Sequence, residues 1–461
     1  MYRVDTIVAR ATAAGRAAIA IIRLSGPEAV EIAGRLLRSA RALRDLPAWK
    51  LARFSAIDPA DGQIIDEVLA VRMPAPRSYT GEDVVEIHCH GSAVVVDTLL
   101  RASMLAGARL AEPGEFTRRA VLNDRMDLVQ AEAVADLIES PVLSGAKAAW
   151  QRLSGALSTQ ILDLRGRLVA VLADIEAFID FSDDDLPEEN PEERQRSLAS
   201  VREEIESLLS GFAAARRERD GYRVVFAGKP NVGKSSLLNS LLGFERAIVS
   251  QEAGTTRDAI METVDLHGFA FVITDTAGVR QTSSASELLA VDRSLREAKK
   301  ADILLRVVDG SRPLDDADYA VLQLQCEDGI EIHVVNKSDL APGLDADDRR
   351  RLAASGSVVV STSTVDSGGC DELKLALIAA AKALKGDAGG SAGLGRERHR
   401  AALARALAAI TAAQSVMASG EQAELASIEL RRALAEVAGI TEVLDNERVL
   451  DLIFSAFCIG K

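Results

Sequence analysis

Cysteine and aromatic residues are scarce in this chain. Its 461 residues include four cysteines, and aromatic residues make up 4% of the total. The cysteines are Cys89, Cys326, Cys370 and Cys458, and their spacing excludes a disulfide framework and predicts reduced thiols. No run of about 18 uncharged apolar residues is present, which argues against a membrane span. The first residues lack the apolar core of a secretion signal, so we expect a cytoplasmic protein.

Charge is unevenly distributed along the chain. There are 54 Lys and Arg residues against 69 Asp and Glu residues, a formal net charge of -15. A chain this acidic is a poor non-specific binder of nucleic acid. Residues 1–125 carry 17 basic and 15 acidic residues, so the acidic excess lies in the remainder. Any contact with RNA must therefore be local and specific to shape.

Changes of pattern divide the chain into segments. Its 48% apolar and 27% charged composition excludes global disorder, and its length suggests about three domains. Residues 1–118 mix strand-like runs at 18–24 and 84–88 with helices that begin near Pro27 and Ser92. This mixture indicates a small α+β domain.

The remainder alternates helical and α/β patterns. Residues 119–217 are poor in glycine and repeat apolar residues at helical spacing, which predicts long helices. We interpret the acidic stretch 180–193 as a solvated connection between two of them. Residues 218–386 alternate strands with helices, which is typical of a doubly wound parallel sheet. Residues 387–461 begin within a glycine-rich joint at 386–393 and return to alanine-rich helix from residue 396. The simplest architecture is a helical domain built from the two helical segments, with the α/β domain inserted. The strands expected in the inserted domain are 223–227, 269–274, 303–308, 331–335 and 357–360.

A phosphate-binding pattern opens the inserted domain. Residues 228–235 fit G-x-x-x-x-G-K-S and lie between a strand and a helix, the context that this pattern needs. Glycines let backbone N–H groups surround phosphates, and the helix N-terminus adds positive dipole. Lys234 would neutralise the β- and γ-phosphates, and the Ser235 hydroxyl would bind Mg²⁺. The expected nucleotide contacts here are Asn231, Val232, Gly233, Lys234, Ser235 and Ser236.

Three further patterns follow in the order of a GTPase. Asp339 ends the run 336–339, and its two acceptors match the N1–H and 2-amino donors of guanine, which selects GTP over ATP. A loop at 254–258 would supply a threonine to Mg²⁺, and Asp275 with the Gly278 N–H would meet Mg²⁺ and the γ-phosphate. The expected contacts are Gly254, Thr255, Thr256, Asp275, Thr276, Ala277, Gly278, Asn336, Lys337 and Asp339.

One position departs from Ras-like GTPases. Val279 stands where they carry a water-orienting glutamine, so water orientation and charge neutralisation must come from elsewhere. The Asn231 amide oxygen is suited to hold a monovalent cation beside the phosphates. Glu287 is a candidate for orienting water, although the residues alone favour a solvated loop carboxylate.

Two other features stay open at this level. On a strand, Glu86, His88 and His90 share one face, which suits a metal site, polar residues at a strand end, or an organic-ligand pocket that uses Glu86. The tail 457–461 is either a buried helix end with an exposed terminal lysine or a segment that docks into another domain.

An ordered set of motifs resembles the MnmE (TrmE) family of GTPases, which modify the wobble uridine of tRNA in bacteria. The set covers the whole length and comprises residues 5–9, 22–26, 79–86, 113–117, 122–128, the GTPase motifs and the terminal 458–461. The resemblance implies an N-terminal folate-binding domain that dimerises, a helical domain of two segments and an inserted Ras-like G domain.

The resemblance also implies chemistry and partners. With an FAD flavoprotein of the MnmG (GidA) type, in a heterotetramer, such proteins add an aminomethyl or carboxymethylaminomethyl group at C5 of the wobble uridine. The one-carbon unit comes from 5-formyl- or 5,10-methylene-tetrahydrofolate, and potassium promotes G-domain dimerisation and hydrolysis. The competing hypothesis is a GTPase switch for ribosome or RNA assembly without one-carbon chemistry.

The resemblance assigns roles to particular residues. Folate contacts correspond to Arg23, Glu86, Arg125 and Lys461. Potassium ligands correspond to Asn231, Ser250, Glu252 and Thr255, and magnesium ligands to Ser235 and Thr256. Glu287 corresponds to the residue that orients water, Cys458 to a tail cysteine considered for tRNA chemistry, and Ser361 and Thr362 to a guanine-contacting loop.

Several positions differ from the family pattern. Arg125 stands where lysine is frequent, Ser250 replaces a threonine, and Ala17 and Ala18 replace paired glycines. The loop 361–363 reads Ser-Thr-Ser where Ser-Ala-x is expected.

Overall fold

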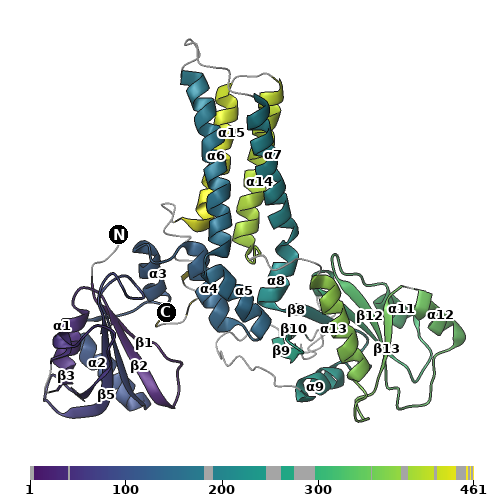
Figure 1. Ribbon diagram of the computed structural model, residues 1–461. Helices are drawn as coiled ribbons and strands as arrows, with labels where there is room; N and C mark the ends of the chain where they lie inside the picture. The colour runs from purple at the N-terminus through teal and green to yellow at the C-terminus, as the bar shows by residue number, and fades with distance from the viewer. Residues whose placement is uncertain are drawn as a thin grey trace, which may run out of the picture. The chain divides into compact units, whose positions relative to one another are not determined.

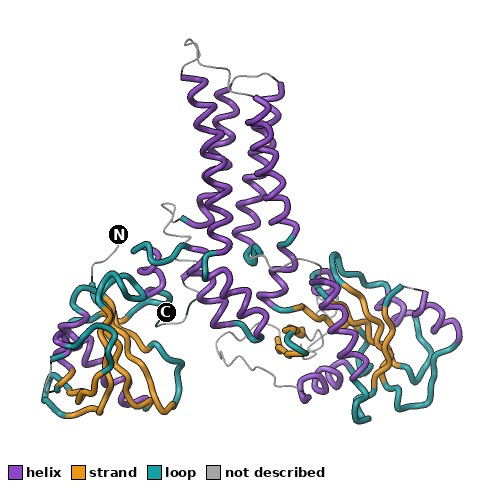
Figure 2. Tube along the Cα trace, viewed as in Figure 1, coloured by secondary structure: helices purple, strands orange, loops and turns teal. Residues whose placement is uncertain are grey.

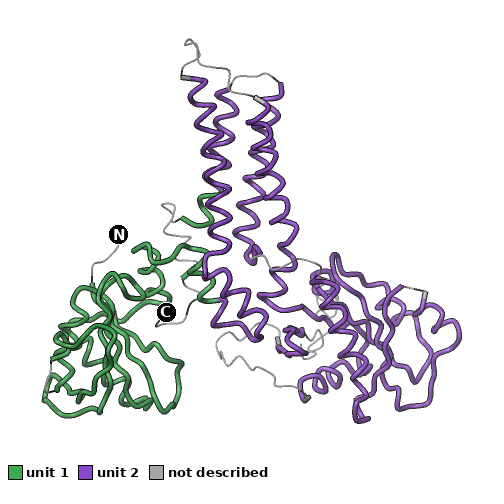
Figure 3. Tube along the Cα trace, in the orientation of Figure 1, with its two compact units in different colours: residues 1–135, 437–461 green, residues 136–436 purple. Residues whose placement is uncertain are grey.

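The computed structural model divides the chain into two compact units. One comprises residues 1–135 and 437–461, and the other residues 136–436 (Figure 3). The structure describes residues 5–39, 42–180, 191–244, 261–274, 296–354, 356–385, 393–419, 423–442, 453, 454, 457 and 460.

The first unit is built on a seven-stranded sheet (Figure 1). Its strand order is β3-β4-β5-β6-β2-β1-β7, and only β1 and β7 run parallel. Central strands β2 and β6 are antiparallel and place Arg23 opposite Glu86. The strands are β1 (Ile7–Arg10), β2 (Ala17–Ser25), β3 (Leu37–Arg38), β4 (Ala52–Ile57), β5 (Ile64–Met73), β6 (Val84–Gly91) and β7 (Arg109–Leu110).

Helices α1 (Ala29–Leu36) and α2 (Ala93–Leu105) cover one face of this sheet. Alternate β2 residues Ile22 and Leu24 are fully buried in one cluster with Ile32 and Leu99 of these helices. The period-2 alternation of a strand therefore puts Arg23 on the opposite face. The strands and helices predicted for this region are confirmed. The short helix η1 (Leu43–Asp45) and helices α3 (Glu115–Leu122) and α4 (Leu128–Glu139) complete the elements.

A buried ion network ties the N-terminal residues to α3. The Arg119 guanidinium is 2% exposed and lies 2.6 Å from Asp5, 3.0 Å from Glu115 and 3.2 Å from Glu82. Arg109 lies 2.6 Å from Glu115 and 2.8 Å from Asp5. Burial alone would raise the pKa of Asp5, but hydrogen bonds from both arginines outweigh it and lower that pKa.

Long helices of the second unit lie side by side (Figures 1 and 2). They are α6 (Ala156–Asp180), α7 (Pro191–Ser210), α14 (Glu397–Ser419) and α15 (Ala423–Thr441), joined by shorter α5 (Leu143–Leu153) and α8 (Phe212–Asp220). Ion pairs link Arg431 of α15 to Glu176 of α6 at 2.7 Å, and Arg405 of α14 to Glu436 of α15 at 2.7 Å. Residues 181–190 of the predicted acidic connection lie outside the described residues.

Among the described helices, α14 is long and apolar enough to cross a membrane by length and composition alone. It packs along α7. Its buried stripe, which includes Ala402, Ala406, Ala409 and Ala413, is the pattern of a helix inside a bundle.

The inserted α/β domain contains a six-stranded sheet. Its order is β13-β12-β11-β8-β10-β9, parallel except for β9. The five predicted strands are present as β8 (Tyr222–Ala227), β10 (Phe269–Thr274), β11 (Ile303–Asp309), β12 (Ile330–Asn336) and β13 (Val358–Thr362).

Strand β9 (Met261–Leu266) was not predicted. It pairs with β10 across a two-residue turn in which His267 and Gly268 have φ values of 52° and 85°. Two residues with positive φ are characteristic of hairpin turns that match the twist of their strands. A sheet assumed to be wholly parallel therefore has an antiparallel edge.

Helices cover both faces of this sheet. Every residue of the central strand β11 is buried. Helices α9 (Lys234–Phe244) and α13 (Asp371–Lys385) pack on one face through Leu237 and Leu377, while α11 (Asp316–Leu322) lies over β11, and α12 (Ala346–Ala354) contacts β13. The fold is therefore the predicted combination of an α+β unit, helices and an inserted α/β domain.

Arg217 connects the two points at which the chain enters and leaves the α/β domain. Arg217 of α8 donates to Asp302 before β11 at 2.8 Å, to the Asp328 carbonyl at 3.1 Å and to the Leu384 carbonyl at 3.2 Å. The last of these lies in α13, near the end of the inserted segment. The start and the end of the insertion are therefore adjacent.

Candidate functional site

Two glycines shape the phosphate loop, residues 228–235. A Cβ added to Gly228 would lie 2.6 Å from the Val307 carbonyl oxygen. At Gly233, φ is +99° and a Cβ would lie 2.1 Å from Asn336 Nδ2. Neither position accommodates a side chain without a shift of its surroundings. The loop consequently approaches β11 and β12 closely.

The loop leads directly into the N-terminus of α9. Lys234 is 8% exposed, and its ammonium donates to the carbonyls of Gly228 and Lys229, both at 2.7 Å. Ser235 and Ser236 are exposed on the first turn of α9. This arrangement places a cation, hydroxyls and the positive end of a helix together, which suits an anionic ligand.

Asn336 joins this loop to the end of β12. Its side chain is 1% exposed, donates to the Val232 carbonyl at 2.8 Å and accepts from the Thr362 hydroxyl at 3.0 Å. Asn336 and its two partners come from three parts of the chain that the sequence assigned to one nucleotide site. The bulk of Thr362, fully buried, is directed inward to this bond.

The neighbouring Lys337 has φ 67° and donates to Asp309 at 2.6 Å. Burial alone would raise the pKa of Asp309, but hydrogen bonds from Lys337 and Ser311 outweigh it and lower that pKa. The lysine therefore fastens the end of β12 to the end of β11.

The exposed Asp339 carboxylate is oriented by a residue that sequence analysis did not assign. Ser363 donates its hydroxyl to Asp339 Oδ1 at 2.9 Å and accepts from the backbone N–H groups of Val365 and Asp366, both at 3.2 Å. A hydroxyl with two backbone donors is held in place. Ser361, by contrast, is exposed, and its backbone N–H donates to the Glu372 carboxylate at 3.2 Å. It is therefore directed to a different partner from Ser363.

Several assigned residues lie outside the described part of the chain. Around the nucleotide they are Ser250, Glu252, Gly254, Thr255, Thr256, Asp275, Thr276, Ala277, Gly278 and Glu287. In the tail they are Cys458 and Lys461.

The first unit pairs two assigned residues on the face of its sheet opposite α1 and α2. Arg23 donates to Glu86 Oε1 at 2.8 Å, and both side chains are mostly buried. The Arg23 guanidinium lies over the rings of Tyr79 and Phe116, 5.5 Å and 5.7 Å from their centroids. The pair thus presents a fixed carboxylate and a fixed cation beside two aromatic rings.

The third assigned residue and the tail approach the same strands. Arg125 donates to the carbonyl of Ser78, the residue before Tyr79, at 3.2 Å. Gly460 has φ +102°, and a Cβ on it would lie 2.0 Å from the Arg10 carbonyl oxygen. Arg10 in turn lies opposite Ile22, next to Arg23. The described tail residue Gly460 therefore lies against β1, and both hypotheses for the remainder of the tail stay open.

The histidines of β6 diverge. His88 Nε2 lies 3.6 Å from Glu86 Oε2, but His90 Nδ1 lies 2.7 Å from Asp66. Among the residues that the structure describes, no group of three or more His, Cys, Asp or Glu side chains is arranged to hold a metal ion. The geometry gives no support to the hypothesis of a metal site.

Comparison with known proteins places the chain. The family model described as "MnmE helical domain" matches residues 128–458, and the model described as "GTP-binding protein TrmE N-terminus" matches residues 6–125. The chain belongs to the MnmE family. The first of these models spans the inserted α/β domain, as expected for a helical domain made of two segments.

Relatives from this family match along their whole length and carry the name tRNA modification GTPase MnmE. The Geobacter metallireducens protein is 43% identical over 467 residues and the Geobacillus thermodenitrificans protein 42% identical over 468, with 100% of each chain covered. The Akkermansia muciniphila protein is 42% identical with 99% coverage of each chain. Among solved structures, the G domain of the T. maritima FeoB iron transporter aligns with 35% of this chain and 98% of its own, at 26% identity and a TM-score of 0.25.

Proposed function

We propose that this protein hydrolyses GTP in the modification of tRNA. The observation that carries the proposal is the buried Asn336 side chain, which joins the phosphate loop at Val232 to the end of β13 at Thr362. A bridge of this kind couples recognition of the base to the position of the phosphates. The names of relatives that match the full length support the same activity.

The nucleotide would be held by the residues assigned to it. Lys234 would neutralise phosphate charge, and the Asp339 carboxylate, oriented by Ser363, would accept from guanine. The exposed hydroxyl of Ser235 beside Lys234 suits Mg²⁺, with Thr256 and Asp275 as its further partners. Bound Mg²⁺ supplies charge neutralisation for phosphoryl transfer.

We assign potassium to Asn231, with Ser250, Glu252 and Thr255. Asn231 is exposed in the phosphate loop with φ 65°, a left-handed conformation that asparagine tolerates better than most residues. GTP turnover should rise when potassium replaces sodium at equal ionic strength. Equal rates of GTP turnover in the two salts would contradict the cation assignment. In a separate test, Glu287→Ala should retain nucleotide binding and lose most GTP hydrolysis.

We assign a tetrahydrofolate derivative, 5-formyl or 5,10-methylene, to the Arg23–Glu86 pair. The Glu86 carboxylate suits the N3–H and 2-amino donors of a pterin, and the partly exposed Tyr79 ring beside Arg23 would provide apolar contact. Arg125 and Lys461 would meet acidic or carbonyl groups of the ligand. Glu86→Gln should lower the affinity for 5-formyl-tetrahydrofolate about tenfold or more, because one acceptor becomes a donor.

A matched control lies on the same strand. His90→Gln changes a side chain on the same face that is 73% exposed and pairs with Asp66. Its affinity for 5-formyl-tetrahydrofolate should stay within about twofold of the parent. Equal losses in both variants would mean that the strand, and not the Arg23–Glu86 pair, governs binding.

The reaction that we propose adds an aminomethyl or carboxymethylaminomethyl group to C5 of the wobble uridine. It requires a flavoprotein partner of the MnmG type and a homodimer of this chain in the cytoplasm. We retain the boundaries 1–118, 119–217, 218–386 and 387–461 for the domains, and a role of Cys458 in the tRNA chemistry, as parts of this proposal.

Nucleoside mass spectrometry of total tRNA tests the proposal directly. A strain without this protein should lose 5-aminomethyl-type wobble uridines, and a rescue copy should restore them. A copy with Lys234→Ala, which removes the phosphate-loop cation, should fail to restore them. Unchanged nucleosides in the deletion strain would favour the alternative, a GTPase switch for RNA assembly.

A further inference from the structure

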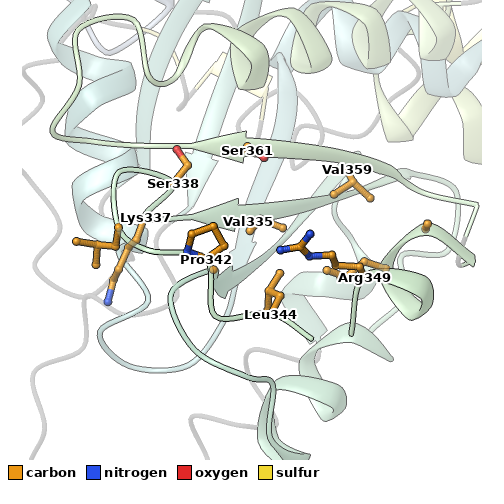
Figure 4. Close-up of a pocket in the computed structure, with 12 residues that line it drawn as sticks. Val335, Lys337, Ser338, Pro342, Leu344, Arg349, Val359 and Ser361 are labelled. Carbon is orange, nitrogen blue, oxygen red and sulfur yellow. The ribbon is translucent and has the colours of Figure 1, made fainter. Parts of the chain in front are cut away.

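A cleft of about 370 Å³ lies between the sheet edge of the α/β domain and α12 (Figure 4). Strand side chains alternate between faces. Val334 and Val360 therefore pack in the core with α13, whereas Val335 and Val359 face the cleft. The cleft is thus on the opposite side of β12 and β13 from the core.

The cleft exists because α12 covers the sheet incompletely. This helix has nine residues, and Leu352 is its large apolar side chain that is buried. Val359, on the edge strand, remains 42% exposed. The space opens to solvent, since Leu340 at its margin is 49% exposed, so a ligand has access to it. Its walls are apolar, formed by Val335, Leu344, Leu352 and Val359.

One cation is directed across this apolar space. Three arginines follow one another in α12, and two of them have partners: Arg350 pairs with Asp347 at 2.6 Å, and Arg351 lies 4.6 Å from the centre of the Tyr319 ring. Within the described part of the chain, Arg349 has no hydrogen-bond acceptor or ion-pair partner. Figure 4 shows its guanidinium extending from α12 toward Val335 and Pro342.

The charge of the cleft is of one sign. None of the residues that line it is acidic. Lys337, at one end, is neutralised by Asp309 at 2.6 Å. The Arg349 charge is therefore the one without a counterpart among the described lining residues. A guanidinium is a planar fork that matches the two oxygens of a carboxylate.

We propose that this cleft binds a small molecule with one carboxylate on an apolar, ring-sized body. The volume lies at the lower end of the range of about 300–1,000 Å³ typical of small-molecule sites. Mostly apolar walls with a few polar groups are the usual composition of such a site, and here the exposed Arg349 guanidinium supplies the charge. One guanidinium is too little to hold a triphosphate, so the cleft does not bind the phosphates, although Lys337 and Ser361 at its margin belong to the proposed guanine site.

Occupancy of the cleft is coupled to nucleotide binding. Lys337 and Ser338 line it and also belong to the run 336–339 that we assign to guanine. A ligand that contacts them changes the affinity for guanine nucleotide, and the nucleotide changes the affinity for the ligand by the same factor. This coupling rests on the proposed function, whereas binding in the cleft does not.

The experiment compares a charged and a neutral probe on the full chain. Indole-3-acetate and indole-3-acetamide have the same ring and nearly the same size. Calorimetry or ligand-observed NMR should show that the acetate binds at least about fivefold more tightly, because it alone forms a charge-assisted pair. Arg349→Gln should weaken acetate binding about tenfold and leave amide binding unchanged. Arg350→Gln, next in sequence and paired outside the cleft, should change neither.

A second variant tests the apolar walls. Val359→Phe fills the cleft from an edge strand and should abolish binding of both probes, while mant-GDP binding persists. No binding of either probe, or equal effects of Arg349→Gln and Arg350→Gln on the acetate, overturns the proposal. Binding of the acetate without any change in GDP affinity overturns the coupling alone. If the parent protein itself did not bind mant-GDP, the proposed function would be refuted instead.

Discussion

Substitution of Gly233 tests how closely the phosphate loop approaches β12. Replacing it with alanine places a Cβ 2.1 Å from Asn336 Nδ2. The amide is the end of a side chain, but it is buried and bonded to Val232 and Thr362, so it has no free space to move into. The substitution must therefore break the bridge or distort the loop.

The magnitude follows from two contributions. Alanine at φ +99° is strained by about 1–3 kcal/mol. Displacing Asn336 leaves a buried polar group without its partner, which costs about 1–3 kcal/mol more. We therefore expect Gly233→Ala to lower the free energy of opening of the α/β domain by roughly 2–6 kcal/mol.

Gly243 provides a control of opposite sign. It lies in α9, and a Cβ there meets nothing within 4 Å. Gly243→Ala should stabilise the helix by about 0.5–1 kcal/mol. Native-state hydrogen exchange of β8 and β12 amides measures both variants in the full chain, and mant-GDP binding reports the function of the loop. Equal protection in the two variants would refute the close approach of Gly233 to Asn336.

Three more predictions concern the wider fold. His333 is 1% exposed, and burial together with the Arg306 charge lowers its pKa from 6.5 to about 4. As pH falls, the histidine takes up a proton in the unfolded chain before it does so in the folded chain. The contribution of His333 to the free energy of unfolding is therefore fully present above pH 6.5 and should fall by about 3 kcal/mol toward pH 4. Urea titrations of His333→Gln should lack this pH dependence. Arg119→Met should lower the free energy of unfolding of the first unit by about 3–5 kcal/mol, because three carboxylates lose a buried partner. Arg101→Met, at an exposed position of α2, should change that free energy by less than about 0.5 kcal/mol. Arg217→Ala should increase hydrogen exchange at the end of α13 as well as in α8, and protection at α13 equal to the parent's would contradict the clamp.

The fold was largely predictable because its patterns are local. Alternation on β2 and the mainly apolar run of β11, interrupted by Arg306, are visible in the sequence, as is the glycine loop before α9. Strand β9 was missed because its alternating residues are polar on one side, and the His267–Gly268 turn was not recognised. β4 and β5 carry charged residues and likewise gave a weak signal.

The candidate site was predictable residue by residue but not in its connections. The run 336–339 and the family resemblance together brought Asn336 and Thr362 into one hypothesis. It did not reveal that Ser363 orients Asp339, because a serine in a loop is common and its partner lies 24 positions away. The Arg23–Glu86 pair, 63 positions apart, depends on the register of β2 and β6, which no single segment encodes.

The adjacency of Arg217 to Leu384 has a consequence for the order of folding. For the helices on either side, the inserted domain is a long loop, and closing a long flexible loop costs entropy that grows with its length. Once the α/β domain has folded and Arg217 has joined its two ends, that loop is already closed. The helices before and after it then meet as near neighbours in the chain. The α/β domain should therefore fold before the helical bundle assembles, although half of the bundle precedes it in the sequence.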